Sequence, residues 1–446
     1  AFPVPGSIRE LRFGRATLSP EGVVELEYSL DDALRFVERI DLPIAQPLGS
    51  DAIREAEPLV NLLHWVAGIS YFKAAIPPKI SCAGPLPGAD TAQLLRALYS
   101  EGLGEFAVEN EIDLPRPDFP FRSEPRSAVG KALGNRLLLP VGGGKDSIVG
   151  LEVLRTAGAS VTLFSVGTMG PIRRTAEVAE LPWLHASRQI DPLLLTYNSH
   201  GALNGHIPVT AIVSAISCLV AVLHNASAVV MSNERSASQG NVQAFGIDVN
   251  HQFSKSLRAE RLFIAALAAA TPDLAYYSIL RGVSELAIAR AFARLPAYHK
   301  AFTSCNAVFR LDQSRRYLSW CGECPKCRFV FLVLAPFMTP GQLTAIFDGR
   351  NLLEDPRQYE GFALLAAVGG DKPFECVGEE QEAIAAFRLL AGNPAWQEAP
   401  VVRRFTRCVL PQLSSDLNLP DRILQWSDDH EIPPELVSHA RSLLDA

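Results

Sequence analysis

A short glycine-rich segment constrains the fold of this 446-residue chain more than any other feature. The apolar run at 136–141 is typical of a buried strand, and a helical pattern follows that ends near Gly158. Three successive glycines, Gly142, Gly143 and Gly144, stand between the two. Further apolar runs at 161–166 and 228–231 alternate with helical patterns. This order favours right-handed βαβ units, and it predicts an α/β fold with a doubly wound, mostly parallel sheet.

The residues of this segment are suited to binding phosphate. Glycines can adopt positive φ angles and can bring backbone N–H groups close to an anion, and the start of a helix adds partial positive charge. Lys145 supplies a point charge, and the Ser147 hydroxyl can donate to a phosphate oxygen. The alternative is a glycine-rich turn without a ligand. We expect Lys145→Ala to abolish the chemistry of the loop and to leave the fold intact.

Half of the eight cysteines lie within 23 positions, which indicates a metal site. Four thiolates are enough for a closed, tetrahedral zinc site, so we predict structural zinc. Four buried thiols without a metal are the alternative, and an iron–sulfur cluster is less compatible with a loop that needs no redox chemistry. Residues 1–15 lack the pattern of a secretion signal, so we expect a reducing, cytoplasmic location. The predicted ligands are Cys305, Cys321, Cys324 and Cys327.

Composition and charge narrow the possible functions. Hydrophobic residues make up 48% of the chain and charged residues 20%, which excludes a disordered or fibrous protein. The formal net charge of −7 lacks the footprint of a nucleic-acid binder, so we expect small-molecule substrates. Polar residues interrupt the longest apolar tract, 207–231, which predicts a buried helix and a strand and no membrane insertion. The oligomeric state is not specified by the sequence.

Four polar residues beside apolar runs are further candidates. Glu234 follows a predicted strand, at the sheet edge where ligands collect, and can bind Mg²⁺ or act as an acid or base. Arg235 can pair with a carboxylate or phosphate, although the same segment can also be a solvated turn. His206 and His251 lie in polar turns and are candidates for substrate binding or for a purely structural role.

A lysine and a cysteine complete the candidates. Lys73 can reach an anionic substrate, or its stem can simply cover apolar surface. Cys376 lies beside a carboxylate in a glycine-flanked turn. A thiol with a lowered pKa can act as a base toward carbon acids, whereas a lone buried cysteine usually only packs.

Turn and proline signals divide the chain. Strand patterns at 11–18 and 23–28 flank a turn, and three prolines within 114–120 indicate a linker. We therefore predict an α+β domain at 1–130, which is the candidate for binding substrate, and an α/β domain at 131–300 that contains the phosphate-binding loop. A cysteine-rich segment at 301–345 and a helical region at 346–446 follow.

The segment from Gly142 to Ser147 resembles the SGGxDS signature of the pyrophosphate-loop ATPases, the adenine-nucleotide α-hydrolase superfamily, with Gly142 in place of serine. The resemblance implies that ATP is split between its α and β phosphates. It also implies that the loop binds the departing pyrophosphate and that adenine lies near the end of the second strand. The cofactor-binding residues it implies are Gly142, Gly143, Gly144, Lys145, Asp146, Ser147, Ser165 and Gly167.

The cysteine cluster resembles the zinc tail of the 7-cyano-7-deazaguanine synthases, with a longer first gap. This similarity keeps a second interpretation open, a deazaguanine-synthase-like or tRNA-modifying ATP-dependent adenylase. A third interpretation is a nucleotide-binding protein without turnover.

Over nearly its whole length the chain resembles the UDP-N-acetyl-α-D-muramoyl-L-alanyl-L-glutamate epimerases of bacterial peptidoglycan synthesis. The similar segments are 70–73, 102–106, 142–147, 205–208, 232–236, 250–252 and 372–376. The family implies an isomerase that uses ATP and Mg²⁺ to turn the L-Glu of a UDP-muramoyl dipeptide into D-Glu, with roles in cell-wall biogenesis, cell shape and division. Its implied route is adenylation of the glutamyl α-carboxylate, exchange of the α-proton and hydrolysis to AMP. The catalytic candidates are Lys145, Asp146, Glu234 and Cys376, and the substrate-binding candidates are Lys73, His206, Arg235 and His251.

Overall fold

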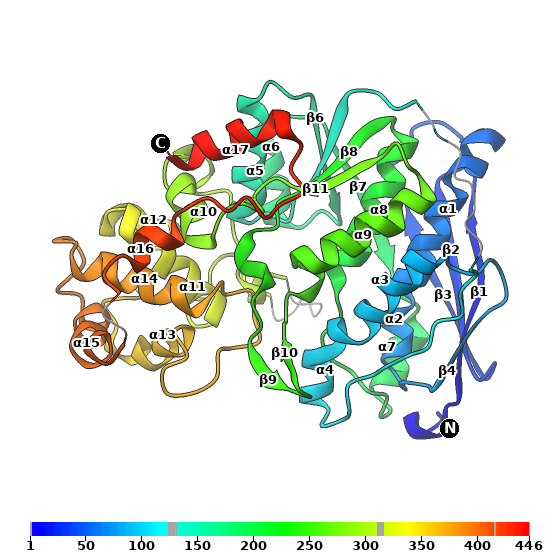
Figure 1. Cartoon of the computed structure of the whole chain (residues 1–446), viewed down its shortest axis with the longest axis horizontal. Coiled ribbons are helices and arrows are strands. Elements are labelled where there is room, and N and C mark those ends of the chain that lie inside the picture. Colours follow the sequence, from blue (N-terminus) through cyan, green and yellow to red (C-terminus); the bar gives the residue numbers. More distant parts are fainter. Residues whose placement is uncertain (1, 124–129, 131, 310–315, 414–415, 446) are drawn as a thin grey trace.

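The computed structural model describes residues 2–123, 130, 132–309, 316–413 and 416–445. Within these ranges, one nine-stranded sheet runs through the molecule in the order β11-β8-β5-β6-β7-β3-β2-β1-β4 (Figure 1). The strands are β1 (Glu10–Leu18), β2 (Val23–Leu30), β3 (Leu34–Asp41), β4 (Lys79–Cys82), β5 (Arg136–Pro140), β6 (Val161–Val166), β7 (Trp183–Gln189), β8 (Ala226–Met231) and β11 (Ala275–Ser278). A separate hairpin joins β9 (Val242–Ala244) to β10 (Ile247–Val249).

The direction of pairing changes along this sheet. The run from β11 to β7 is parallel throughout, whereas β3, β2 and β1 pair antiparallel with their neighbours. At the far edge, β4 returns parallel to β1. The predicted mixed α/β class with a mostly parallel sheet is confirmed. The sheet continues across residue 130 through the β3–β7 pair, in which Ile40 lies opposite Arg188.

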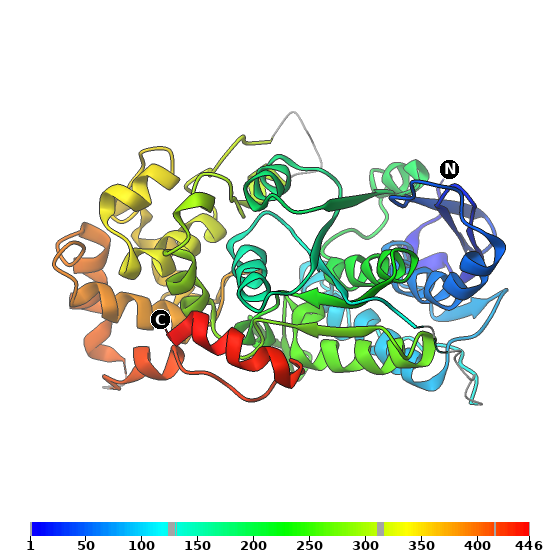
Figure 2. The ribbon, with the colours of Figure 1, turned by 90° about the horizontal axis from the view of Figure 1, so that it is seen from above.

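Helices cover both faces of the sheet (Figure 2). The N-terminal part contains α1 (Ser50–Ala67), α2 (Ile69–Phe72), α3 (Ala89–Tyr99) and α4 (Gly104–Glu109). The middle part contains α5 (Lys145–Thr156), α6 (Gly170–Ala179), α7 (Pro192–Asn198), α8 (Val209–Leu223), α9 (Leu257–Ala270) and α10 (Glu285–Phe292). The chain continues with α11 (Pro325–Leu334) and α12 (Pro340–Ile346). The predicted helical region at 346–446 is confirmed by α13 (Tyr359–Leu365), α14 (Glu380–Ala391), α15 (Pro400–Cys408), α16 (Leu419–Ile423) and α17 (Pro434–Asp445).

The sheet separates two apolar cores because successive strand residues point to opposite faces. Leu138 and Val229 belong to the core formed with α1, α8 and α9. Their neighbours Leu139 and Val230 belong to the core formed with α5, α10 and α11. Burial on both faces is typical of parallel strands and explains why β5, β6 and β8 are apolar throughout their centres. No described helix is long and apolar enough to cross a bilayer.

The candidate functional residues collect at one edge of this sheet. β5 lies between β6 and β8, and α5 and α8 pack on opposite faces, so β5 marks the point where the winding direction changes. Ligands of open α/β sheets bind at the carboxyl ends of the strands around such a point. The segments that follow β5, β6, β8 and β11 therefore form the candidate site.

Candidate functional site

The glycine loop connects β5 to α5 in a conformation that requires glycine. Gly143 has a φ of +80°, and a Cβ there would lie 2.7 Å from the Cβ of Pro171 and 2.9 Å from the backbone nitrogen of Ile172. Gly144 is the N-cap of α5, where no side chain caps the first N–H groups. The Ser147 hydroxyl donates to the Gly144 carbonyl at 3.2 Å. The start of α5 therefore presents backbone donors that can bind an anion.

Lys145 points into a buried acidic cluster. Its Nζ forms ion pairs with Asp146 Oδ1 at 2.5 Å and with Glu285 Oε2, and the side chain is 2% exposed. Burial lowers the pKa of Lys145, but the attraction of Asp146 and Glu285 outweighs this and holds it above its usual value. Burial raises the pKa of Asp146, but the attraction of Lys145 and Lys326 outweighs this and holds it below its usual value. Lys145 is thus a permanent cation whose charge is already balanced by two carboxylates.

Three carboxylates converge beside Lys145. One oxygen from each of Asp146, Glu234 and Glu285 lies within 4.8 Å of the others. Burial raises the pKa of Glu234 to about 8, with further contributions from Glu285 and Asp146. Clustered carboxylate oxygens are the ligands that Mg²⁺ and Ca²⁺ favour. A divalent cation would also lower the proton affinity of Glu234.

Cys376 lies on the other side of this acidic cluster. Lys326 connects the two, because its Nζ lies 3.8 Å from Glu285 Oε1 and donates to the Cys376 carbonyl at 2.5 Å. The Cys376 sulfur lies 3.6 Å from Lys255 Nζ and is hydrogen-bonded to His251. Burial raises the pKa of Cys376, but Lys255 and His251 outweigh it and bring the pKa to about 6. The structure therefore places a cysteine with a lowered pKa beside Lys255, and Lys326 and Glu285 connect it to Lys145 of the loop.

The two predicted histidines and Lys73 extend the site away from the loop. The rings of His206 and His251 lie 4.2 Å apart between centroids, at an angle of 36°. Burial and the neighbouring His251 lower the pKa of His206 to about 4. Lys73 donates to Asn204 Oδ1 at 2.6 Å, and burial lowers its pKa to about 8. The two histidine rings thus pack against each other at a tilt, and Lys73 hydrogen-bonds Asn204, two residues before His206.

Arg235 is the one predicted substrate-binding residue whose side chain contacts the C-terminal segment instead of the candidate site. Its guanidinium donates to the carbonyls of Ile423 at 2.9 Å and of Gln425 at 3.1 Å. It therefore connects the segment after β8 to the C-terminal helices.

Ser165 and Gly167 lie at the carboxyl end of β6, next to the glycine loop. The Ser165 hydroxyl donates to the Gly167 carbonyl at 2.7 Å and accepts from Trp183 Nε1 at 2.9 Å. Gly167 has a φ of +86°, which favours glycine. These contacts give the chain a tight turn where the resemblance implies adenine.

The four predicted zinc ligands come together. Their sulfurs lie within 4.8 Å of one another, with 3.9 Å between Cys305 and Cys324 and 3.6 Å between Cys321 and Cys327. A tetrahedral zinc site with bonds of ~2.3 Å places its sulfurs about 3.8 Å apart. The four residues fit such a site, and the metal itself stays a prediction.

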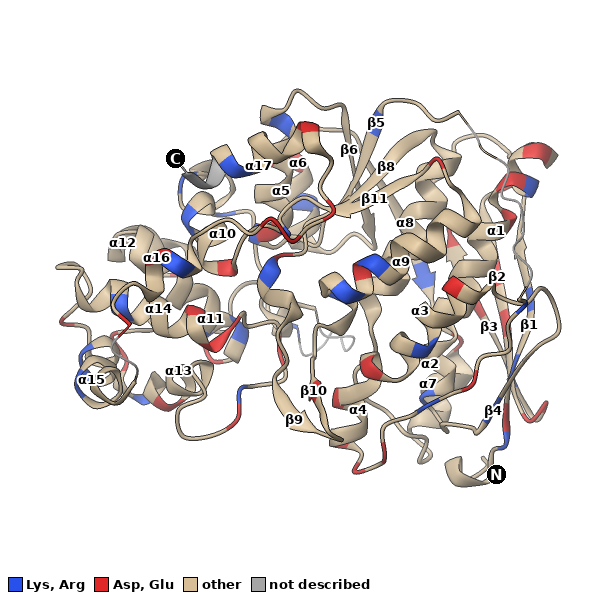
Figure 3. Cartoon of the chain, in the orientation of Figure 1, with Lys and Arg blue, Asp and Glu red and all other residues tan. Residues whose placement is uncertain are grey.

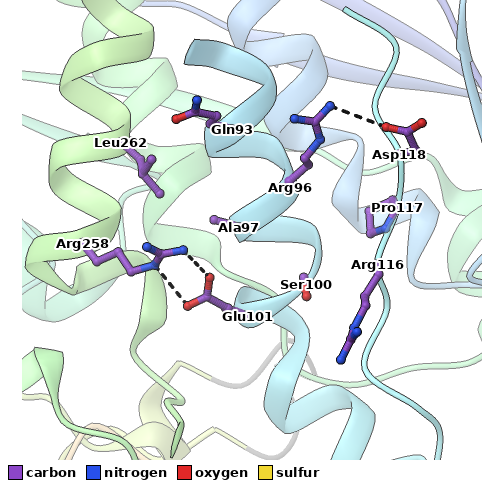
Figure 4. Close-up of a pocket in the computed structure, with 10 residues that line it drawn as sticks. All are labelled: Gln93, Arg96, Ala97, Ser100, Glu101, Arg116, Pro117, Asp118, Arg258 and Leu262. Atoms are coloured by element: carbon purple, nitrogen blue, oxygen red, sulfur yellow. Dashed lines mark hydrogen bonds and ion pairs between the residues drawn. The ribbon is translucent and has the colours of Figure 1, made fainter. Parts of the chain in front are cut away.

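A groove opens between α3 and α9 close to this site (Figure 4). It has a volume of about 550 Å³, and three arginines line it. Arg258 pairs with Glu101 at 2.8 Å, and Arg96 lies 3.5 Å from Asp118. Glu101 lies four residues before Glu105 and Arg258 lies three residues after Lys255, so two of the groove residues are close in sequence to residues of the site.

Sequence reasoning missed four residues of the site. Glu105, Lys255, Glu285 and Lys326 reach it from α4, the segment before α9, the start of α10 and the start of α11. Glu105 lies in the similar segment 102–106, and Lys326 lies between two cluster cysteines. Lys255 and Glu285 carry no comparable local signal.

Comparison with known proteins places the chain in a family. The model of the MurL N-terminal domain matches residues 4–279, and that of the MurL C-terminal domain matches residues 301–418. The chain belongs to the MurL family. A relative from Xanthomonas oryzae pv. oryzae is 43% identical over 98% of this chain and 97% of its own length. A relative from Salinispora tropica is 44% identical over 90% of this chain and 87% of its own length.

Both relatives are named UDP-N-acetyl-alpha-D-muramoyl-L-alanyl-L-glutamate epimerase, as is a third from a Micromonospora species that is 43% identical over 97% of this chain and 96% of its own length. The MurL chain described here is accordingly an epimerase, an enzyme of the isomerase class. The family resemblance inferred from its sequence segments is confirmed.

Proposed function

We propose that this MurL protein converts the terminal L-Glu of UDP-MurNAc-L-Ala-L-Glu to D-Glu at the expense of ATP, which is split into AMP and pyrophosphate. The relatives' names support the substrate and the epimerisation. The observation that carries the use of ATP is the uncapped glycine loop between β5 and α5, at the carboxyl edge of the parallel strands. Backbone N–H groups and a helix start are suited to hold the pyrophosphate that leaves.

Adenylation addresses the difficulty of this epimerisation. The α-hydrogen next to a free carboxylate is barely acidic, because its removal would place negative charge beside an existing anion. An acyl-adenylate removes that charge and provides a carbonyl that accepts the electron pair as an enolate. A proton can then return on the opposite face, and water releases AMP.

The acidic residues beside the loop support a role for Mg²⁺. Asp146, Glu234 and Glu285 would hold it, since their oxygens are close enough to share one cation. When bound, the cation supplies charge that stabilises the phosphates of ATP. The chain's own Lys145 remains between Asp146 and Glu285 and forms an ion pair with each of them.

The proposal is tested by incubating the protein with UDP-MurNAc-L-Ala-L-Glu, ATP and Mg²⁺ in D₂O. We expect deuterium at the glutamyl α-carbon together with AMP and pyrophosphate. Reactions without the dipeptide or without ATP serve as controls. Active protein that forms D-Glu without consuming ATP, or that forms ADP, would overturn the ATP-splitting step. AMP formation that does not depend on the dipeptide would instead favour the alternative adenylase.

A further inference from the structure

A continuous set of contacts connects Glu105 to the sulfur of Cys376. Glu105 Oε2 contacts His251 Nδ1, and His251 in turn hydrogen-bonds Cys376. We propose that Cys376 removes the glutamyl α-proton in one direction of the epimerisation, and that His251, oriented by Glu105, holds the sulfur as a thiolate. The inference rests on the proposed function for its substrate, but the state of the thiol can be measured without it.

Local backbone geometry brings Glu105 to His251. Glu105 lies on α4, and His251 follows the β9–β10 hairpin. A Cβ at Gly104 would lie 2.9 Å from Val249 Cγ1, and a Cβ at Gly102 would lie 3.0 Å from Pro208 Cγ. Gly104 lets α4 approach the hairpin closely enough for the carboxylate to reach the ring, and Gly102 lets the turn before α4 pack on Pro208. The Glu105 and His251 side chains are 8% and 16% exposed, so water screens their attraction only weakly.

Basic side chains from three segments surround Cys376. His251 comes from the segment after β10, Lys255 from the segment before α9 and Lys326 from α11. Glu375, the residue before Cys376, accepts from the Lys326 backbone nitrogen at 3.1 Å. Burial lowers the pKa of His251, but its hydrogen bonds to Cys376 and Glu105 bring it up to about 9. The sulfur is therefore surrounded mainly by cations.

The arrangement of thiol, imidazole and carboxylate is the one that activates nucleophilic and basic cysteines elsewhere. Here the thiolate forms an S–H bond as the C–H bond of the activated glutamyl group breaks. The electron pair of that C–H bond moves to the acyl carbonyl as an enolate. No oxidant or reductant is needed, and a donor on the opposite face returns a proton. Cys376 is the catalytic residue of this step, and His251 and Glu105 are positioning residues.

The state of the thiol is measured by alkylation with iodoacetamide between pH 4 and 10, followed by mass spectrometry of the peptide that contains Cys376. ATP and substrate are left out. The unaltered protein should react with a midpoint near pH 6, where burial, Lys255 and His251 place the pKa of the thiol. His251→Asn should raise the midpoint by more than one pH unit, and Glu105→Gln should raise it by less. Glu111→Gln, which changes an exposed carboxylate just after α4, is the matched control and should leave the midpoint unchanged.

Turnover gives an independent readout. kcat/KM should fall as the pH drops through about 6, because protonation of Cys376 removes the base. The same limb should move to higher pH in His251→Asn, and Cys376→Ser should lose at least 100-fold in α-proton exchange while still forming AMP. Melting curves identify variants that fail to fold. An unchanged alkylation midpoint in folded His251→Asn, or full exchange in Cys376→Ser, would overturn the inference. Failure of ATP splitting would leave the alkylation result intact and would count only against the proposed function.

Discussion

Lys145 shows how one side chain can serve both stability and chemistry. It is buried between Asp146 and Glu285, and its own charge keeps these carboxylates from being isolated in the interior. The sequence-based expectation that Lys145→Ala leaves the fold intact disagrees with this environment, because the substitution leaves Glu285 buried without its closest cation. Removing one partner of a buried pair is strongly destabilising.

We therefore expect Lys145→Ala to lose AMP formation and to lower the free energy of unfolding by roughly 3–5 kcal/mol. Urea denaturation measures the second effect. In the matched variant Lys145→Met with Glu285→Gln, both charges are removed and much of the stability should return. A Lys145→Ala protein as stable as the unaltered chain would show that Glu285 does not depend on Lys145.

Individual residues were predictable from sequence where their chemistry is local. The glycine loop and the cysteine cluster can each be recognised in a short segment of sequence, and the structure brings the members of each together. Lys255 and Glu285 could not be found, because each acts through a partner more than a hundred residues away. Arg235 had the right chemistry for an anion, but main-chain carbonyls near the C-terminus use its donors.

At the scale of an element, α11 depends on the cysteine cluster at its start. Cys324 is the N-cap of α11 and accepts from the Cys327 backbone nitrogen, and the helix that follows is buried from Phe329 to Leu334. Strands such as β5, β6 and β8 were predictable because an apolar run of that length between turn signals has few alternatives. The position of α11 in the core that it forms with α5 and α10 was not predictable, because the longer loop between Cys305 and Cys321 does not fix the direction of the helix.

We expect about one equivalent of zinc per chain in metal analysis, and we expect a chelator to lower Tm, because a bound zinc ion would connect the start of α11 to Cys305. Cys327→Ser should lower Tm in the same way. Cys408→Ser is the control, because Cys408 is exposed and lies outside the cluster. Less than about half an equivalent of zinc, with no effect of the chelator, would favour four free thiols.

At the scale of the whole molecule, one sheet carries both the N-terminal strands and the glycine loop. The core on the α1, α8 and α9 face contains residues from Ile8 to Tyr276, so residues before and after position 130 share it. Acidic and basic residues are interspersed over the ribbon (Figure 3), and the net charge of −7 does not reveal the lysines gathered at the site. Continuity of the sheet was not predictable, because the β3–β7 pair joins residues about 150 positions apart.

A fragment of residues 1–130 should consequently not fold by itself. It would leave β3 without β7 and would expose the face of α1 that packs on α8. We expect no cooperative thermal transition by circular dichroism and strong binding of an apolar dye, with the full chain as the control. A fragment that unfolds cooperatively with native-like strand content would show that the first 130 residues form an autonomous domain.

The β3–β7 pair also limits how this enzyme can move. Hinged opening between the N-terminal strands and the strands beside the glycine loop would break main-chain hydrogen bonds within the sheet, so those two parts should move as one rigid body. Cys376 is different, because it lies in the turn between α13 and α14. This turn contacts that rigid body mainly through side chains such as Lys255 and Asn241. Of the groups that meet at the site, the Cys376 sulfur and the Lys326 ammonium are thus the ones whose distance from the loop the C-terminal helices can adjust.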